Sequence, residues 1–275
     1  MVRLRIVADD GRSPAQRAQD LHRARDRPEA RERLAAVLTP LREARRRIEA
    51  ALAEVGSGSP TIPPTIPPTI PPRVWQLLDD AYLALDRYLA ELLHAAAIDP
   101  ACGPRCSACC TDLPPILPVE ALRMVRTLRR RSDGTRRMQR AVEQTRAFQE
   151  LLLAHLGPTD SRTRLDGTEP SYREAQIAWR RLGHPCPVLG DDGSCSAYES
   201  RPLSCRAHVH VEDPAHCEPS SPRFLIAERP PVWGHPRECE VELALATISK
   251  LLGLQGAPNL PWGLAVFHDH PLGAG

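Results

Sequence analysis

The sequence predicts a mainly α-helical fold in which irregular, proline-rich loops carry the cysteines. Apolar residues recur every three or four positions in several stretches, which is the period of a helix that buries one face. Long strands do not alternate with these stretches, and prolines punctuate the segments between them. One short hairpin is expected, at the turn signal Asp192-Gly193.

The most regular helical pattern is expected to end near Ala97. Its buried face consists of Val74, Leu78, Ala81, Leu85, Tyr88 and Leu92. Similar patterns predict four further helices, over residues 119–131, 135–155, 171–182 and 238–252. The first cysteine cluster directly follows the first of these helices, so we expect the cysteines to lie in loops between helices.

An N-terminal arm, residues 1–55, shows the same period in a shorter stretch. Its apolar positions are Leu34, Leu38, Leu41, Ile48, Leu52 and Val55. Arg45 interrupts this face, and Pro40 is expected to break or kink the helix. The result is a short amphipathic helix or hairpin that is too small to fold well alone. It is expected to pack on the main domain or on a second copy, and a dedicated partner-binding arm is the alternative.

A linker over residues 56–72 separates the arm from the rest of the chain. It begins with glycine and serine and continues with three copies of Thr-Ile-Pro-Pro. Proline fixes φ and lacks an N–H donor, so the repeat is expected to form a stiff polyproline II spacer of roughly 37 Å. A proline-motif ligand for a partner is the alternative. Residues 73–275 then form the predicted cysteine-cluster domain.

Composition narrows the class of protein. Hydrophobic residues make up 42% and charged residues 25% of 275 residues, which is the balance of a soluble folded protein. The 36 basic and 34 acidic residues nearly cancel, so no global charge favours nucleic acid or a membrane surface. No run of 18 apolar residues or apolar leader is visible, and we expect a cytoplasmic protein. In a reducing compartment, its nine cysteines indicate metal binding or catalysis rather than disulfides.

Seven of these cysteines form two clusters and are the candidate metal ligands. They are Cys102, Cys106, Cys109 and Cys110 in the first cluster, and Cys186, Cys195 and Cys205 in the second. Thiolates two or three residues apart converge on one soft cation where the chain turns. Neighbouring side chains diverge, so Cys109 and Cys110 are expected to serve different metals unless one only packs. A tetrahedral ion takes four ligands, so seven sulfurs favour a polynuclear site or two sites.

The motifs around these cysteines resemble the YkgJ-like cysteine-cluster family, a zinc- or iron-chelating domain. The family pattern is a CxxCxxCC run followed by CPxL, Gly-x-Cys-x-x-Tyr and RPxxCR, which correspond here to residues 102–110, 186–189, 193–198 and 201–206. Three residues separate Cys102 from Cys106, where the family usually has two. The resemblance implies that the domain binds zinc or iron.

Several other residues are candidates for supporting roles. Arg105, Arg201 and Arg206 adjoin the ligands and are expected to offset thiolate charge, although surface positions are the alternative. An eighth ligand could come from one of the cysteines or histidines outside the family pattern, which are Cys217, Cys239, His208, His210 and His216. Tyr198 is expected to pack rather than to catalyse. Zinc, iron and an iron–sulfur cluster all suit thiolates, and Cys186-Pro187 slightly favours the cluster.

Three functions compete at the level of sequence. The chain is a metal-binding module with a protein partner, a redox protein or metalloenzyme, or a carrier of metal ions. No Ser-His-Asp set, carboxylate pair or phosphate loop stands near the cysteines, so catalytic residues remain unknown. The Cys-x3-Cys-x2-Cys spacing is that of radical S-adenosylmethionine enzymes, but the β-α units of their barrel are missing. A similar domain in flagellin lysine methylases makes protein methylation a further alternative implied by resemblance.

Overall fold

The computed structural model describes residues 11–56, 70–101, 106–156, 170–211, 214–217, 221–223, 230–254 and 256–270. Helices dominate these ranges, and the only β-type pairings within them are two isolated bridges, Ile116–Ala257 and Leu189–Cys195. The predicted mainly helical fold is confirmed. The expected hairpin is reduced to the second bridge, whose turn contains Gly193 at φ 77°, a left-handed conformation that glycine adopts without a steric penalty.

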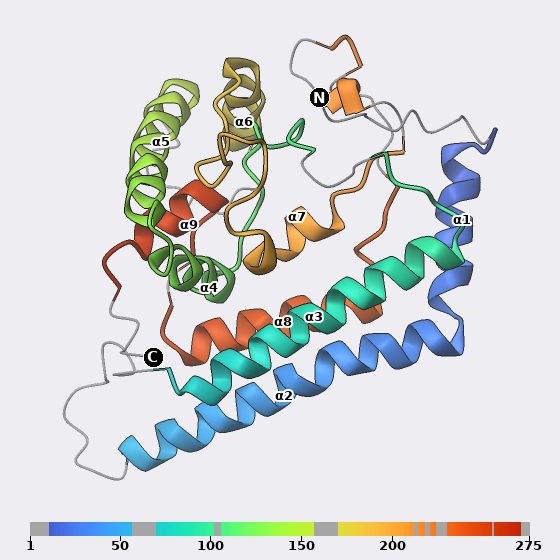
Figure 1. The fold of residues 1–275 in the computed structure, drawn as a ribbon, viewed down its shortest axis with the longest axis horizontal. Coiled ribbons are helices and arrows are strands. Elements are labelled where there is room, and N and C mark those ends of the chain that lie inside the picture. Colours follow the sequence, from blue (N-terminus) through green and yellow to red (C-terminus); the bar gives the residue numbers. More distant parts are fainter. Residues whose placement is uncertain are drawn as a thin grey trace.

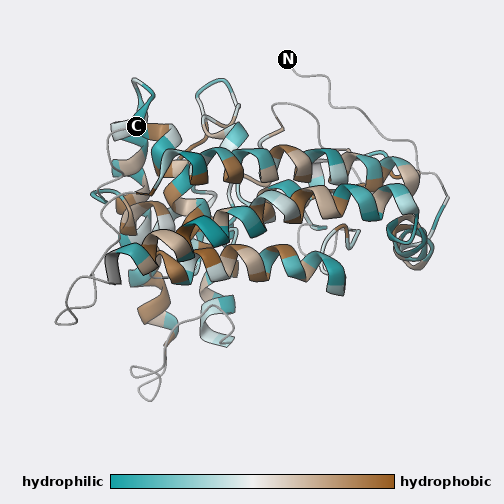
Figure 2. Ribbon diagram, turned by 90° about the horizontal axis from the view of Figure 1, so that it is seen from below, coloured by the Kyte–Doolittle hydropathy of each residue, from teal (hydrophilic) through white to brown (hydrophobic). Residues whose placement is uncertain are grey.

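Three long helices form one side of the molecule. They are α2 (Pro28–Gly56), α3 (Pro72–Ala95) and α8 (Pro236–Leu251), with α1 (Pro14–Arg25) across one end (Figures 1 and 2). α2 packs against both α3 and α8. Their facing apolar side chains are buried in one continuous core, which extends to α4 (Pro118–Arg129). The arm therefore packs on the main domain, which was one of its two expected positions.

Pro40 does not end the arm helix. Of the two expected effects, the break was wrong, because α2 continues through Pro40 as far as Gly56, and the kink stays a prediction. Proline inside a helix costs about 3 kcal/mol, whereas burial of a leucine side chain contributes roughly 1.5–3 kcal/mol. Leu34, Leu38 and Leu41 are all buried around this position, so packing outweighs the local penalty. The linker residues 57–69 lie outside the described ranges, and the domain boundaries stay a prediction.

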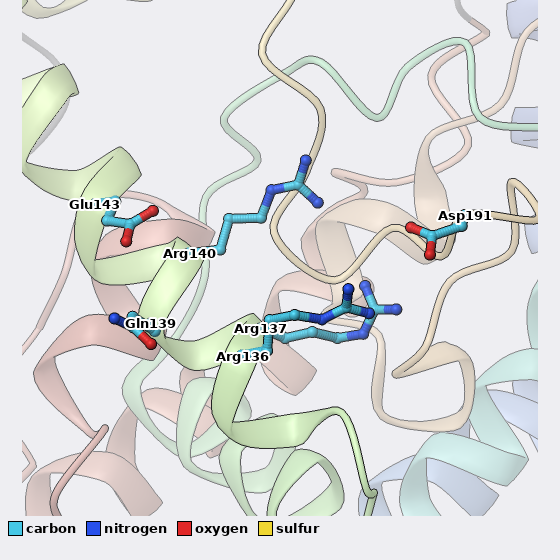
Figure 3. A pocket seen from close by; sticks show the side chains of 6 residues that line it. All are labelled: Arg136, Arg137, Gln139, Arg140, Glu143 and Asp191. Carbon is cyan, nitrogen blue, oxygen red and sulfur yellow. The ribbon is translucent and has the colours of Figure 1, made fainter.

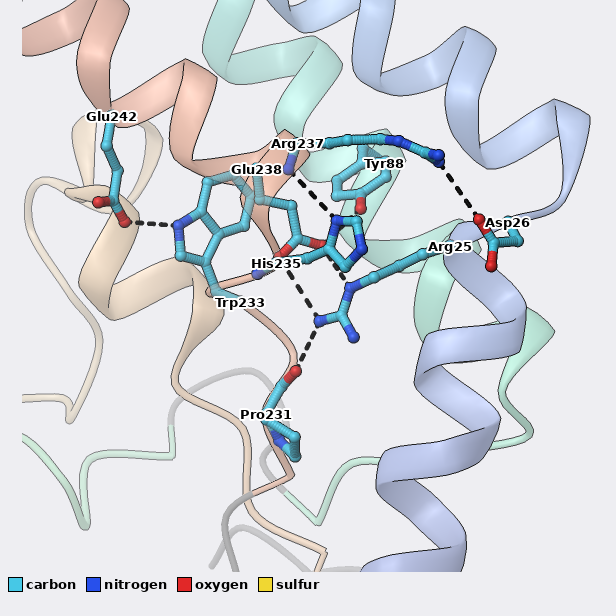
Figure 4. Close-up of polar contacts among 9 residues, drawn as sticks. All are labelled: Arg25, Asp26, Tyr88, Pro231, Trp233, His235, Arg237, Glu238 and Glu242. Atoms are coloured by element: carbon cyan, nitrogen blue, oxygen red, sulfur yellow. Dashed lines mark hydrogen bonds and ion pairs between the residues drawn. The ribbon is translucent and has the colours of Figure 1, made fainter.

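A buried ion pair joins α1 to α8. Arg25 donates through Nε to Glu238 Oε1 at 2.8 Å and through Nη2 to the Pro231 carbonyl oxygen at 2.6 Å. The Tyr88 hydroxyl donates to the same Oε1 at 2.6 Å, and burial followed by this carboxylate raises the Tyr88 pKa. Glu238 is fully buried, and Figure 4 shows Arg25 and Tyr88 directed at its carboxylate. The arm is thus attached by polar as well as apolar contacts.

A second group of helices packs beside the long ones. It contains α4, α5 (Gly134–His155), α6 (Pro170–Leu182) and α9 (Leu260–Val266) (Figure 1). A smaller apolar cluster lies between them; its members are Leu113, Phe148, Leu152, Tyr172, Ala175 and Trp179. The five helices predicted after the linker are confirmed within two residues at each end, as α3, α4, α5, α6 and α8, whereas α1, α7 and α9 were missed. None of the described helices is long and apolar enough to cross a membrane.

Two segments of loops and short helical turns between the two groups of helices carry the described candidate ligands, whereas Cys239 lies on α8. The first runs from residue 106 to α4, and the second from α6 through η2 (Tyr198–Ser200) to α7 (Leu203–Ala207). A further short turn, η3 (Pro214–Cys217), follows α7. Figure 1 shows α7 between the two helix groups. The loops that hold the candidate ligands are therefore supported by helices on both sides.

Candidate metal centre

The two cysteine clusters meet through a backbone hydrogen bond. The N–H of Cys186 donates to the carbonyl oxygen of Cys110 at 2.5 Å. Two tight turns shape the first cluster, in which Cys110 N–H donates to the Ser107 oxygen at 2.8 Å and Asp112 N–H to the Cys109 oxygen at 3.1 Å. Segments about 76 positions apart along the chain thus lie side by side, at little extra entropic cost for a closure of that length.

A compact turn sets the position of Cys195 relative to Cys186. Ser196 N–H donates to the Val188 oxygen at 2.8 Å, and Gly190 N–H donates to the Ser194 oxygen at 2.6 Å. Val188 is buried in the main core and anchors the turn. Cys186 and Cys195 therefore approach one another at the open end of this turn.

Glu120, a buried carboxylate on α4, holds the start of α7. Its Oε1 accepts from the Leu203 N–H at 2.7 Å and from the Tyr82 hydroxyl at 2.5 Å, while its Oε2 accepts from the Leu117 N–H at 2.9 Å. Cys205 lies two residues after Leu203 on the same short helix. Burial raises the pKa of Glu120, and these hydrogen bonds oppose that rise. One carboxylate thereby fixes the backbone that presents Cys205.

Two side chains from α5 hold the other cysteine loop. Arg137 donates through Nη1 to the Leu189 carbonyl oxygen at 2.6 Å and pairs through Nε with Asp133 Oδ2 at 2.7 Å. The amide of Gln144 donates to the Pro185 oxygen at 2.7 Å, immediately before Cys186. α5 therefore supports the cysteine turn at two points of its backbone.

The sulfurs of both clusters influence one another electrostatically. Burial raises the pKa of Cys186, and the charges of Cys205, Cys195 and Cys109 add to the rise. Burial raises the pKa of Cys205 to about 12, and Cys109 and Cys195 again contribute. These four sulfurs are consequently close enough to repel one another once ionised.

The pKa values of Cys109, in the first cluster, and Cys195, in the second, are raised in different surroundings. A hydrogen bond with Cys110, then burial, then the charges of Cys110 and Cys106 raise the pKa of Cys109. Burial also raises the pKa of Cys195, where Arg201, Arg137 and Arg206 oppose the rise. Positive charge is thus concentrated beside the second cluster. At neutral pH without a cation, these cysteines remain thiols.

The donor set fits a soft cation, although the side chains are not arranged around one. No three His, Cys, Asp or Glu side chains of the described ranges are placed to hold a metal ion. Cys102 and Arg105 lie outside these ranges. Several partly buried thiols whose pKa values are raised are nevertheless suited to a metal, because a bound cation deprotonates a coordinating thiol outright. The chemistry and the meeting of the loops favour metal binding.

Comparison with known families agrees with this chemistry. Residues 101–223 match the model of a family named CxxCxxCC, which is described as "Putative zinc- or iron-chelating domain". Over this segment, which is less than half of the chain, the protein is similar to the CxxCxxCC family. The resemblance inferred from the motifs is confirmed, and with it a zinc- or iron-chelating class of domain. No curated protein and no solved structure was found to match the chain.

The other candidate residues differ in burial, and not all of them lie within the matched segment. Cys217 is buried on η3, whereas Cys239 is exposed on α8, after the end of the family match. The carbonyl oxygen of His210 accepts from the Ala101 N–H at 2.8 Å, beside the position where Cys102 follows. Tyr198 is 53% exposed rather than packed inside.

The arginines of the CxxCxxCC domain have distinct contacts. Arg206 is buried, pairs with Asp86 and donates to the Arg201 and Glu199 carbonyl oxygens, at 2.9 and 2.6 Å. The guanidinium of Arg201 lies 3.9 Å from the centre of the Tyr198 ring. Arg206 therefore braces the backbone before Cys205 in addition to supplying charge.

Sequence reasoning missed Glu120, Arg137 and Gln144 as supports of the centre. Glu120 interrupts an apolar stretch of α4 and lies three residues after Leu117, whose N–H it accepts, so a buried charge was a visible signal. Arg137 and Gln144 follow the ordinary polar pattern of a surface helix. Their contacts depend on the tertiary approach of α5, and no local signal identifies them.

Proposed function

We propose that the CxxCxxCC domain holds zinc or iron, as ions or as an iron–sulfur cluster, through a cysteine-thiolate site. The proposed ligands are Cys102, Cys106, Cys109, Cys110, Cys186, Cys195 and Cys205. The observation that carries the proposal is the approach of Cys109, Cys186, Cys195 and Cys205, which come from two distant clusters. Cys109 and Cys195 raise the pKa values of both Cys186 and Cys205. A shared cation would relieve the repulsion between these partly buried sulfurs once they are ionised.

These four sulfurs are proposed as the primary set, because zinc and iron both accept four thiolates in tetrahedral geometry. Cys102, Cys106 and Cys110 would then contribute to a second ion or to a larger cluster. A divalent ion with four thiolates carries roughly two excess negative charges. Arg137, Arg201 and Arg206 lie near enough to Cys195 to offset this charge.

The metal is proposed to act chiefly on structure. The segments that carry the cysteines contain only short helices and isolated bridges in their described parts, so bound metal would supply part of their folding free energy. Such a module would present a fixed surface to a protein partner. A reducing cytoplasm suits a site that depends on free thiols, and the described cysteines are free.

The alternative proposal is an iron–sulfur redox protein or metalloenzyme, linked to S-adenosylmethionine by its cysteine spacing or to protein methylation by its family resemblance. When bound, an iron–sulfur cluster would supply electron transfer. The positive charges around Cys195 and the partial exposure of the cysteines are features that would influence a reduction potential.

Anaerobic purification followed by metal analysis and an absorption spectrum tests both proposals. Stoichiometric iron, inorganic sulfide and a band near about 400 nm would establish the cluster. Colourless protein with stoichiometric zinc would establish the structural module. Protein that binds neither metal after anaerobic refolding with zinc or iron would refute the metal site.

A further inference from the structure

A basic pocket lies on the outer side of α5, beside the second cysteine loop. Its volume is about 430 Å³. The lining residues are Arg136, Arg137, Gln139, Arg140, Glu143 and Asp191. Figure 3 shows the side chains of Arg136, Arg137 and Arg140 extending from α5 toward the side on which Asp191 lies. Three guanidinium groups thus share one concave region with two carboxylates.

The positive charge of this pocket is only partly neutralised. Arg137 is paired with Asp133 at 2.7 Å and also donates to the Leu189 oxygen, so it is held in place. By contrast, neither Arg136 nor Arg140 forms an ion pair or hydrogen bond with another described residue. Glu143 lies one turn from Arg140 without bonding it. Two guanidinium forks therefore remain available on a rigid helix.

We propose that this pocket binds a small molecule that carries a phosphate group, with Arg136 and Arg140 as the phosphate ligands. A guanidinium presents parallel N–H donors that match two oxygens of a phosphate, and charge-assisted hydrogen bonds of this kind are among the strongest in proteins. The Gln139 amide supplies a further donor. Glu143 and Asp191 provide acceptors for hydroxyl or amino groups elsewhere on the ligand.

Size and position favour a small ligand. Pockets for small molecules usually enclose about 300–1,000 Å³, and this one falls toward the lower end. The pocket also adjoins the cysteine loop, because Arg137 bonds the Leu189 oxygen and Leu189 pairs with Cys195. The pocket itself requires no metal ligand, so this inference goes beyond the proposed metal site and can fail separately from it.

Calorimetric titration of the full chain with glycerol phosphate tests the pocket, with glycerol as the uncharged comparison. We expect saturable binding of glycerol phosphate that weakens as salt is added, and none of glycerol. Arg140→Gln and Arg136→Gln should each weaken binding by roughly tenfold or more, since each removes charged hydrogen bonds. Arg146→Gln is the matched control, because Arg146 is exposed on the same helix but does not line the pocket.

Three results would overturn the proposal. The first is an absence of saturable binding to the folded wild-type chain. The second is equal weakening by Arg146→Gln, which would indicate attraction to general positive charge. The third is tighter binding of a phosphoserine peptide than of glycerol phosphate, which would exclude a small molecule as the preferred ligand. Metal content measured on the same samples keeps a failure here distinct from a failure of the metal site.

Discussion

Replacing Glu120 by glutamine tests whether one buried carboxylate couples the fold to the cysteine centre. The substitution preserves the size of the side chain but leaves one acceptor oxygen in place of two. If this oxygen keeps the bonds from Tyr82 and Leu203, the amide nitrogen faces the Leu117 N–H, which now bonds Oε2 at 2.9 Å. The N–H of Leu117 and the amide of the new glutamine are then two donors that face one another. Residue 120 is only 3% exposed, so both donors lie in a buried environment.

The expected loss for Glu120→Gln is about 1–3 kcal/mol in the free energy of unfolding, the cost of a lost hydrogen bond and an unsatisfied buried donor. Glu120→Ala should cost more, because it removes all three bonds. Metal retention against a chelator should also fall, since Leu203 begins the helix that presents Cys205.

Urea denaturation followed by circular dichroism measures the stability of each variant, and metal analysis after dialysis against chelator measures retention. Glu174→Gln, at an exposed site on α6, is the matched control and should change stability by less than about 0.5 kcal/mol. A Glu120→Gln protein as stable as this control would refute the reasoning. A large loss of stability with unchanged metal retention would refute the coupling to Cys205.

Two further predictions concern the arm and the thiols. Arg25→Ala should lower the free energy of unfolding by about 3–5 kcal/mol, because it leaves the fully buried Glu238 without its cation (Figure 4). Arg31→Ala, which removes an exposed pair with Asp26, should cost less than about 1 kcal/mol, and equal losses in urea denaturation would contradict this account. The metal-free protein should lose stability as pH rises from about 9 toward 12, because folding raises the pKa of Cys205 and so favours its protonated form. A Cys205→Ser variant with the same alkaline loss, measured by thermal unfolding across pH, would show that another group is responsible.

Sequence reasoning located most helices because each buries one face. The stretch containing Val74, Leu78 and Leu92 repeats at the helical period, and all three side chains are buried. α1 was missed because it has few apolar residues, although Ser13 and Gln16 form a capping box at its start. The error at Pro40 arose because a local penalty was read without the tertiary packing that exceeds it.

The meeting of the cysteine clusters could be anticipated from ligand chemistry, whereas their supports could not. The spacing of cysteines identifies candidate ligands along the chain. The hydrogen-bond partners of a buried carboxylate such as Glu120, however, depend on which other helices pack against it. The same holds for Arg137, whose sequence context is that of a surface residue although its side chain is buried. Local sequence patterns therefore indicate which residues are buried or chelating, but they do not indicate which polar residues meet across the fold.

Metal content of serine variants, purified anaerobically, tests the central claim most directly. Cys205→Ser should lose most of the metal and unfold at a lower temperature than the wild type, because ligation contributes on the order of 10 kcal/mol in structural zinc sites. Cys239→Ser, at an exposed position on α8, is the matched control and should keep both metal and stability. Full metal retention by Cys205→Ser, or equal loss from Cys239→Ser, would contradict the proposed thiolate centre.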